Sequence, residues 1–283
     1  MFTAAIRLFP ALFATFSLIL ALAPIGRAGA ADVSAWDGDA RSAARLIAAK
    51  AVAAQLRAGV EIRLAPGWKT YWRYPGDSGV PPRFDFSESD NVKAVTLRWP
   101  APQLFSDVDG NTIGYQNEVI FPLQVEAQNP SKPVTLRVKL DYAVCEKLCV
   151  PAEAKAELVL TDASNANEAA LAAGESRVPR PSRVGEAGAL SIVSIRHEAG
   201  STPPRVLVDV WAPAGAKPAV FAEGPTADWA LPVPKATSGA PAGQQRFVFV
   251  LDGLPPETKP EGATLRLTAV TADTAIEATY RLD

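Results

Sequence analysis

Proline and glycine interrupt this chain so often that they favour short strands and turns over long helices. The 283 residues include 25 prolines and 19 glycines, and no long segment keeps an apolar period of 3.6 residues. Several short runs instead place apolar residues at every second position, which is typical of half-buried strands. The sequence therefore predicts an all-β fold of many short strands joined by turns.

The N-terminus has the pattern of a secretory signal peptide over residues 1–31. Arg7 supplies positive charge, residues 8–23 are mostly apolar, and Ala28-Gly29-Ala30 is a small-residue cleavage site. No later stretch reaches the roughly 20 apolar residues that a membrane-spanning helix needs. An uncleaved N-terminal anchor is the alternative interpretation. We expect an exported, soluble mature chain in a compartment where disulfides persist.

A change in composition and a proline-containing stretch divide the mature chain into two domains. Residues 163–189 differ from their surroundings, since residues 162–174 have the composition of one short surface helix and the prolines near 180 stiffen the chain. We therefore predict a first domain over 32–162, a linker over 163–189 and a second, smaller β-sandwich domain over 190–283. The formal net charge of -2 gives no basic footprint, so no nucleic-acid partner is predicted.

Alternating patterns place most of the strands. Strands are predicted at residues 92–99, 117–127, 134–142, 190–196, 205–211, 246–251, 264–272 and 275–281, and less cleanly at 154–160. Residues 41–64 are ambiguous, because the alanine-rich part at 41–57 has high helix propensity whereas 59–64 alternates like a strand. The residues alone leave both interpretations open.

An aromatic segment stands before a loop rich in proline, glycine, aspartate and serine. Trp68, Tyr71, Trp72 and Tyr74 precede this loop, and the density of turn residues predicts an irregular connection. Loops that carry aromatic side chains are often functional. Alternatively, the rings fill one end of a sandwich core. Both interpretations hold if the tryptophans are packed and one of the tyrosines faces a cleft.

The only two cysteines, Cys145 and Cys149, lie four positions apart in the connection between two predicted strands. A purely structural disulfide is one interpretation, but closing so short a loop stabilises a fold by only about 2 kcal/mol, against about 4.7 kcal/mol for a hundred-residue loop. A redox pair fits better, because one thiol can attack a partner's disulfide while the other resolves the mixed intermediate.

A metal site is the third interpretation of the cysteine pair. The two thiolates would need further ligands, but His197 is the only histidine and Met1 the only methionine. No metal and no cofactor are predicted. The acidic turn near Gly110 lacks the further ligands of an EF-hand, so it predicts no calcium site either. We expect His197 at a strand end and solvated, too far from the cysteines for a protease-like pair.

Several motifs in order along the chain carry a family resemblance. The stretches are GVEIRLAPGWKTYW at 59–72, PGDSG at 75–79, WP at 99–100, GY at 114–115 and VCEKLCVP at 144–151. Over about residues 35–161 the chain thus resembles the N-terminal periplasmic domain of the DsbD family of thiol:disulfide interchange proteins, in particular the ScsB-like branch. The resemblance implies a periplasmic protein with an immunoglobulin-like β-sandwich, and hence strands at 41–64.

The activity implied by this resemblance is electron transfer between protein thiols. Family members pass reducing equivalents from a membrane-embedded partner, through thioredoxin-like domains, to oxidised periplasmic proteins. The resemblance makes Cys145 and Cys149 the redox-active pair of a thiol:disulfide oxidoreductase. It also implies a cap that shields the reduced pair from stray oxidants. The candidates for this cap are Tyr71, Trp72, Tyr74 and Pro75.

Two departures from the family pattern bear on function. Three residues separate the cysteines, fewer than in the best-known DsbD N-terminal domain, and the sequence stops at Asp283 without a membrane domain or a thioredoxin-like domain. We therefore expect thioredoxin-like periplasmic proteins and a separate membrane-embedded electron donor as partners. The alternative functions are a non-catalytic binding or adaptor module with a structural disulfide, and a thiolate copper or metal-handling protein.

Overall fold

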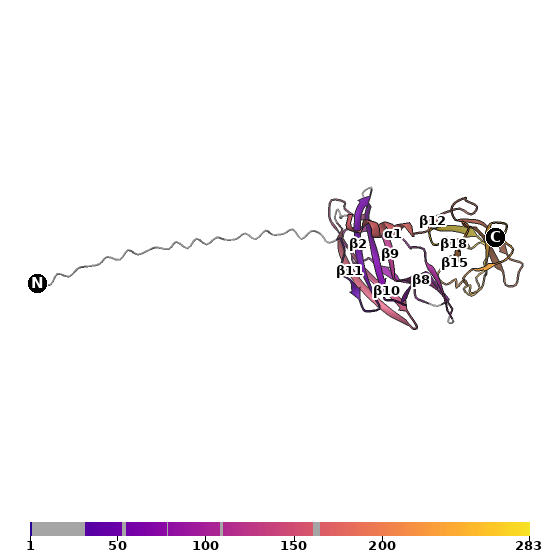
Figure 1. Ribbon diagram of the computed structural model, residues 1–283, viewed down its shortest axis with the longest axis horizontal. Coiled ribbons are helices and arrows are strands. Elements are labelled where there is room, and N and C mark those ends of the chain that lie inside the picture. Colours follow the sequence, from indigo (N-terminus) through magenta and orange to yellow (C-terminus); the bar gives the residue numbers. More distant parts are fainter. Residues whose placement is uncertain (2–31, 53–54, 78, 108–109, 161–164) are drawn as a thin grey trace.

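The computed structural model describes Met1 and residues 32–283, except 53–54, 78, 108–109 and 161–164. The predicted signal peptide therefore lies, Met1 apart, outside the described residues. Four β-sheets form two sandwiches, and Figure 1 shows them side by side along the long axis of the molecule. The prediction of an all-β protein with an immunoglobulin-like N-terminal sandwich and a second sandwich is confirmed.

The first sandwich is built from the strands between residues 37 and 160. One sheet has the order β1-β2-β3-β9-β6. Its strands are β1 (Asp37–Gly38), β2 (Ser42–Val52), β3 (Gln55–Leu64), β9 (Glu118–Ala127) and β6 (Val92–Leu97). The other has the order β11-β10-β4-β8-β7, with β5 paired to β10. Its strands are β11 (Cys149–Leu160), β10 (Val134–Cys145), β4 (Lys69–Gly76), β8 (Gly110–Gln116), β7 (Gln103–Asp107) and β5 (Arg83–Asp85).

From Ser42 onwards, the described residues of the ambiguous segment at 41–64 form strands β2 and β3, as the family resemblance implied. β2 and β3 pair antiparallel, and β2 is buried on both of its faces. Leu46 belongs to the sandwich core, whereas Ile47 points to the opposite side and packs with Leu171. Two-sided burial against close neighbours suits small alanines, so tertiary packing overrides their helix propensity.

The helix α1 (Glu168–Ser176) follows a short 3₁₀ turn at Asn165–Asn167. The predicted surface helix is in fact packed onto the first sandwich, because Leu171 is fully buried with Ile47, Ala49 and Ile120. A Cβ atom at Gly174 would lie 3.1 Å from the side chain of Ile120. The glycine therefore lets the helix approach β9 closely.

The second sandwich is built from two four-stranded sheets. One has the order β12-β19-β18-β15 and the other β13-β14-β17-β16. The first contains β12 (Arg180–Pro181), β19 (Ala275–Arg281), β18 (Thr264–Val270) and β15 (Ala219–Glu223). The second contains β13 (Ser191–Glu198), β14 (Arg205–Trp211), β17 (Gln244–Val250) and β16 (Lys235–Thr237). All five strands predicted here are present, whereas β12, β15 and β16 were not predicted.

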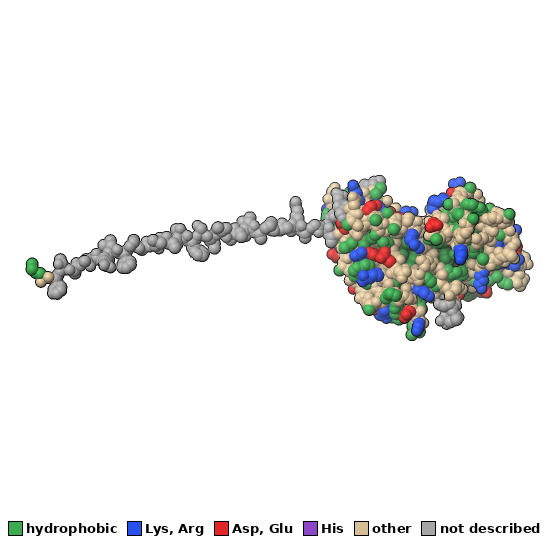
Figure 2. Space-filling model, viewed as in Figure 1, with side chains coloured by type: hydrophobic (Ala, Val, Ile, Leu, Met, Phe, Trp, Pro, Cys, Tyr) green, Lys and Arg blue, Asp and Glu red, His purple; other side chains and the backbone are tan. Residues whose placement is uncertain are grey.

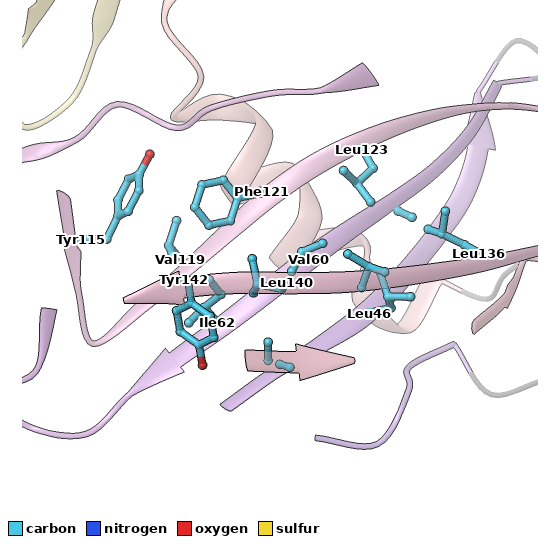
Figure 3. Close-up of a cluster of buried hydrophobic side chains, with 14 of the residues drawn as sticks. Leu46, Val60, Ile62, Tyr115, Val119, Phe121, Leu123, Leu136, Leu140 and Tyr142 are labelled. Carbon is cyan, nitrogen blue, oxygen red and sulfur yellow. The ribbon is translucent and has the colours of Figure 1, made fainter. Parts of the chain in front are cut away.

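The core of the first sandwich is drawn from both of its sheets. Figure 3 shows Phe121 of β9 among side chains of facing strands, including Leu140 of β10. The ring of Phe121 lies 5.1 Å from Phe84, 5.2 Å from Trp99 and 5.4 Å from Tyr115 between centroids. These tilted and edge-on contacts are the favourable geometries for aromatic pairs.

The surface carries both signs of charge. Figure 2 shows basic, acidic and apolar side chains intermixed over the visible face, as the small net charge implies. Within residues 32–283, apart from the undescribed gaps, no helix is long and apolar enough to cross a membrane.

Candidate functional site

The two cysteines face each other at the end of the β10–β11 hairpin. β10 ends at Cys145, β11 begins at Cys149, and the two residues are directly paired across the ladder. Both are free, with the Sγ atoms 3.0 Å apart. Paired residues of antiparallel strands have Cα atoms about 4.5 to 5.5 Å apart, which lies within the range that disulfides require. The hairpin therefore holds the pair ready to form a bond.

Exposure differs between the two sulfur-bearing residues. Cys149 is exposed and Cys145 is only partly so. Leu148 at the tip of the turn is 78% exposed, which makes the hairpin end an open, apolar-edged surface. A partner protein can therefore reach Cys149 from solvent without moving the fold.

Tyr71 is the aromatic residue that contacts the cysteines. Its hydroxyl lies 2.7 Å from the Sγ atom of Cys149, and only 1% of the residue is exposed. The contact follows from pairing of β4 with β10, in which Thr70 is opposite Val144. Burial raises the pKa of Tyr71, and hydrogen bonds with the cysteines raise it further. The hydroxyl therefore stays protonated and can donate to a sulfur.

The backbone at Gly79 covers the Tyr71 ring. A Cβ atom at this position would lie 2.4 Å from Cε1 of Tyr71 and 3.0 Å from Cβ of Pro75, and φ is +148°. Only glycine can bring its backbone this close to the ring and adopt this φ. The turn-rich segment predicted from the sequence thus packs against Tyr71, with Pro75 beside it.

Cys145 has a second neighbour, Lys69, directly opposite it on β4. Burial and the hydrogen bond with Cys149 raise the pKa of the Cys145 thiol, while the Tyr71 hydroxyl and the charge of Lys69 lower it. The Lys69 ammonium also lies 5.0 Å from the ring centroid of Phe105. Lys69 and Cys145 are far apart in the sequence, so only the pairing of β4 with β10 makes them neighbours.

Two of the other cap candidates, Trp72 and Tyr74, contact the second sandwich instead. Trp72 is fully buried, and its ring lies 5.7 Å from that of Phe221 in the second sandwich. The Tyr74 hydroxyl donates to the carbonyl oxygen of Leu231, at 2.6 Å. The aromatic residues from Tyr71 to Tyr74 lie in strand β4, which has a register shift between Tyr71 and Gly76. The described residues of the turn-rich loop that follows, 77 and 79–82, lie outside the strands, as predicted.

Comparison with known proteins relates this site to a family. Residues 40–161 match the family model described as thiol:disulfide interchange protein DsbD, N-terminal. Residues 40–161 are therefore similar to the DsbD N-terminal family. A comparison with curated proteins gave no match. The match contains both cysteines, Tyr71 and the whole of β4.

A solved structure extends the similarity of fold beyond the DsbD N-terminal domain. The crystal structure of the N-terminal periplasmic domain of ScsB from Proteus mirabilis superimposes with a TM-score of 0.70. It is 20% identical in sequence, and the alignment covers 89% of this chain and 98% of the ScsB domain. The likeness in fold therefore includes the second sandwich.

The single histidine lies in the second sandwich, outside the DsbD N-terminal domain. The expectation that His197 is solvated is wrong, since only 1% of its side chain is exposed. Its Nδ1 atom lies 2.9 Å from the backbone oxygen of Asp283.

In the part of the chain that the structure describes, no three histidine, cysteine, aspartate or glutamate side chains are grouped to hold a metal ion. Asp109 of the acidic turn lies outside the described residues.

All five tyrosines of the chain have a raised pKa, and burial is the main cause for each. The pKa of Tyr74 is raised to about 12, against 10.0 for a free tyrosine. Tyrosines of the unfolded chain therefore ionise at lower pH than those of the folded chain. The contribution of these buried tyrosines to the free energy of unfolding is fully present below pH 10.0. It declines as the pH rises towards the pKa values of the tyrosines in the folded protein.

We expect ultraviolet absorbance at pH 10 to show far less tyrosinate in the folded protein than in the urea-denatured chain, of which half the tyrosines are ionised at that pH. Denaturation curves should show a lower free energy of unfolding as the pH rises further. Equal tyrosinate absorbance in the two states at pH 10 would contradict the burial of these hydroxyls.

Proposed function

We propose that this protein is a periplasmic thiol:disulfide interchange protein whose Cys145–Cys149 pair exchanges electrons with thioredoxin-like partners. The observation that carries the proposal is the facing pair of free thiols, 3.0 Å apart at an exposed hairpin end and in contact with the buried Tyr71 hydroxyl. The match of residues 40–161 to the DsbD N-terminal family supports it. The periplasmic source of the structurally similar ScsB domain supports the location.

The exchange proceeds through a mixed disulfide. The thiolate of the more exposed Cys149 attacks the disulfide of a partner, whose S–S bond breaks as one partner sulfur leaves as a thiolate. Cys145, the neighbouring sulfur, then attacks the mixed disulfide and releases the second partner thiolate. The protein ends with a Cys145–Cys149 disulfide and the partner with two thiols, a transfer of two electrons. The same steps in reverse reduce the Cys145–Cys149 disulfide again, with thiols of an electron donor embedded in the membrane as the reductant.

The surroundings of the pair support exchange over a structural role. The bridge would close a hairpin whose strands are already paired residue by residue from Val134 to Cys145, so it adds little further constraint. Tyr71 covers one side of the pair and is itself covered by the backbone of Gly79, while Cys149 stays exposed to solvent. A reduced dithiol in an oxidising compartment needs such one-sided protection.

The reduction potential of the purified protein tests this function. The full chain is equilibrated in glutathione or dithiothreitol buffers, and the free thiols of Cys145 and Cys149 are counted by alkylation and mass spectrometry. We expect a potential between about -270 and -180 mV, the range of thioredoxins and disulfide isomerases. A potential well below about -300 mV is typical of structural disulfides and would identify the domain as a binding module with an inert bridge.

A further inference from the structure

Strand β4 contains a bulge immediately after Tyr71. Tyr71 pairs with Gly114 of β8, and the next pair is Gly76 with Thr112. Residues 72–75 of β4 therefore lie opposite Ile113 alone, and most of them are left out of the ladder. Bulges bend a strand and re-aim its side chains, and they are frequent next to functional sites.

Each of the first three residues of this bulge contacts the second sandwich. Trp72 packs on Phe221, and the Tyr74 hydroxyl donates to the Leu231 carbonyl. Arg73 lies between them and donates two hydrogen bonds of 2.8 Å to the two carboxylate oxygens of Glu223. It also donates to Glu277. The residue that contacts Cys149 is thus followed directly by three that contact strands or loops between 221 and 277.

The arginine and its two glutamates form a largely buried clamp. The side chains of Arg73, Glu223 and Glu277 are only 18%, 12% and 27% exposed. The guanidinium also lies 4.4 Å from the ring centroid of Trp72, a cation–π distance. Paired, bidentate contacts away from solvent fix both position and orientation. The clamp therefore restricts movement of the bulge relative to the second sandwich.

We propose that the second sandwich is a positioning element for the cysteine pair, in which the Arg73 clamp fixes the β4 bulge and thereby holds the Tyr71 hydroxyl on Cys149. Arg73 is a positioning residue in this arrangement, because it contacts neither sulfur. Tyr71 and Arg73 are separated by one residue, so a shift of the bulge displaces the tyrosine. A role of the clamp in thiol exchange rests on the proposed function, whereas its effect on the position of Tyr71 does not.

Loss of the tyrosine contact should favour the disulfide. A thiolate accepts a stronger hydrogen bond than the neutral sulfur of a disulfide, so the Tyr71 hydroxyl stabilises the reduced pair. Tyr71→Phe removes one hydrogen bond and should shift the dithiol–disulfide equilibrium towards the disulfide about threefold to tenfold. This corresponds to a potential lower by about 15 to 30 mV.

The test compares Arg73→Gln with Arg57→Gln, which removes a similar clamp elsewhere in the full chain. Arg57 of β3 donates to both carboxylate oxygens of Glu175 and to Glu168, and its side chain is 11% exposed. It anchors helix α1 and does not contact the hairpin that carries the cysteines. Arg57→Gln therefore removes the same charge and the same kind of clamp without touching β4.

We expect Arg73→Gln to shift the equilibrium with glutathione or dithiothreitol in the same direction as Tyr71→Phe, while Arg57→Gln leaves it unchanged. The double variant Tyr71→Phe/Arg73→Gln should shift no further than Tyr71→Phe alone, since both act through one hydrogen bond. If Arg73→Gln does not fold, Tyr74→Phe replaces it, because this variant removes only the hydrogen bond to Leu231. Tyr74→Phe should then shift the dithiol–disulfide equilibrium in the same direction as Tyr71→Phe, but by less.

An unchanged equilibrium in folded Arg73→Gln, or in Tyr74→Phe where that variant is used, overturns the proposal. Additive shifts in the double variant overturn it as well. These measurements use small thiols and no partner protein. A pair with the potential of a structural disulfide would therefore defeat the proposed function and leave the clamp effect measurable, whereas a pair in the exchange range without the clamp effect would defeat only this inference.

Discussion

Cys149→Ser is expected to abolish electron exchange between the full chain and thioredoxin-like proteins, with turnover falling to the rate seen without the protein. The substitution removes the exposed sulfur that a partner reaches first, and the half-buried Cys145 then has no second sulfur with which to form a disulfide. The assay mixes the reduced chain with an oxidised thioredoxin-like protein and follows the appearance of partner thiols by alkylation.

Cys145→Ser should behave differently from Cys149→Ser, although both lose turnover. With Cys149 intact and no resolving sulfur, the mixed disulfide with the partner should accumulate and be visible on a non-reducing gel. Lys147→Ser, in the same turn, is the control that keeps both sulfurs and should retain exchange. Full exchange by Cys149→Ser with every thioredoxin-like protein tested would refute the proposed function.

Phe121→Ala should cause the largest loss of stability among single core substitutions in the first sandwich. The side chain is fully buried and contacts three aromatic rings, so its removal leaves a cavity that the surrounding rings cannot easily fill. Truncation of a buried phenylalanine costs about 3 to 5 kcal/mol of unfolding free energy. Urea denaturation followed by circular dichroism measures this loss.

The matched control for Phe121→Ala is Phe105→Ala on β7. Phe105 is only partly buried, so the same truncation there should cost about 1 kcal/mol or less. Equal losses at the two positions would show that the Phe121 cluster is not the centre of the core. The comparison also separates the effect of a cavity from the general effect of losing an aromatic side chain.

Much of the fold follows from local patterns in the sequence. Side chains of a strand alternate between its two faces by covalent geometry, so Val134, Leu136, Val138 and Leu140 identify the buried face of β10 without any knowledge of its neighbours. The short spacing of the cysteines likewise places both sulfurs at one hairpin end, because three residues are just enough to reverse the chain. These features depend on residues close together along the backbone.

The family resemblance settled what local propensity left open. Residues 41–57 have the composition of a helix, yet residues 42–52 form strand β2, since they are packed between the sandwich core and helix α1. The small alanines that raise helix propensity are also the residues that fit between two close layers. A strand prediction here needed knowledge of the packing partners, which the resemblance supplied indirectly.

The surroundings of the cysteines were decided by tertiary structure alone. Lys69 faces Cys145 only because β4 pairs with β10, and the Arg73–Glu223 pair joins residues 150 positions apart. No periodicity in a sequence encodes which distant strand becomes a neighbour, or where a bulge will turn a side chain towards another sandwich. The sequence by itself therefore determined the strands that have clear alternation, and the dithiol hairpin. The packing of β4 against β10 and the second sandwich decided which residues act on the cysteine pair.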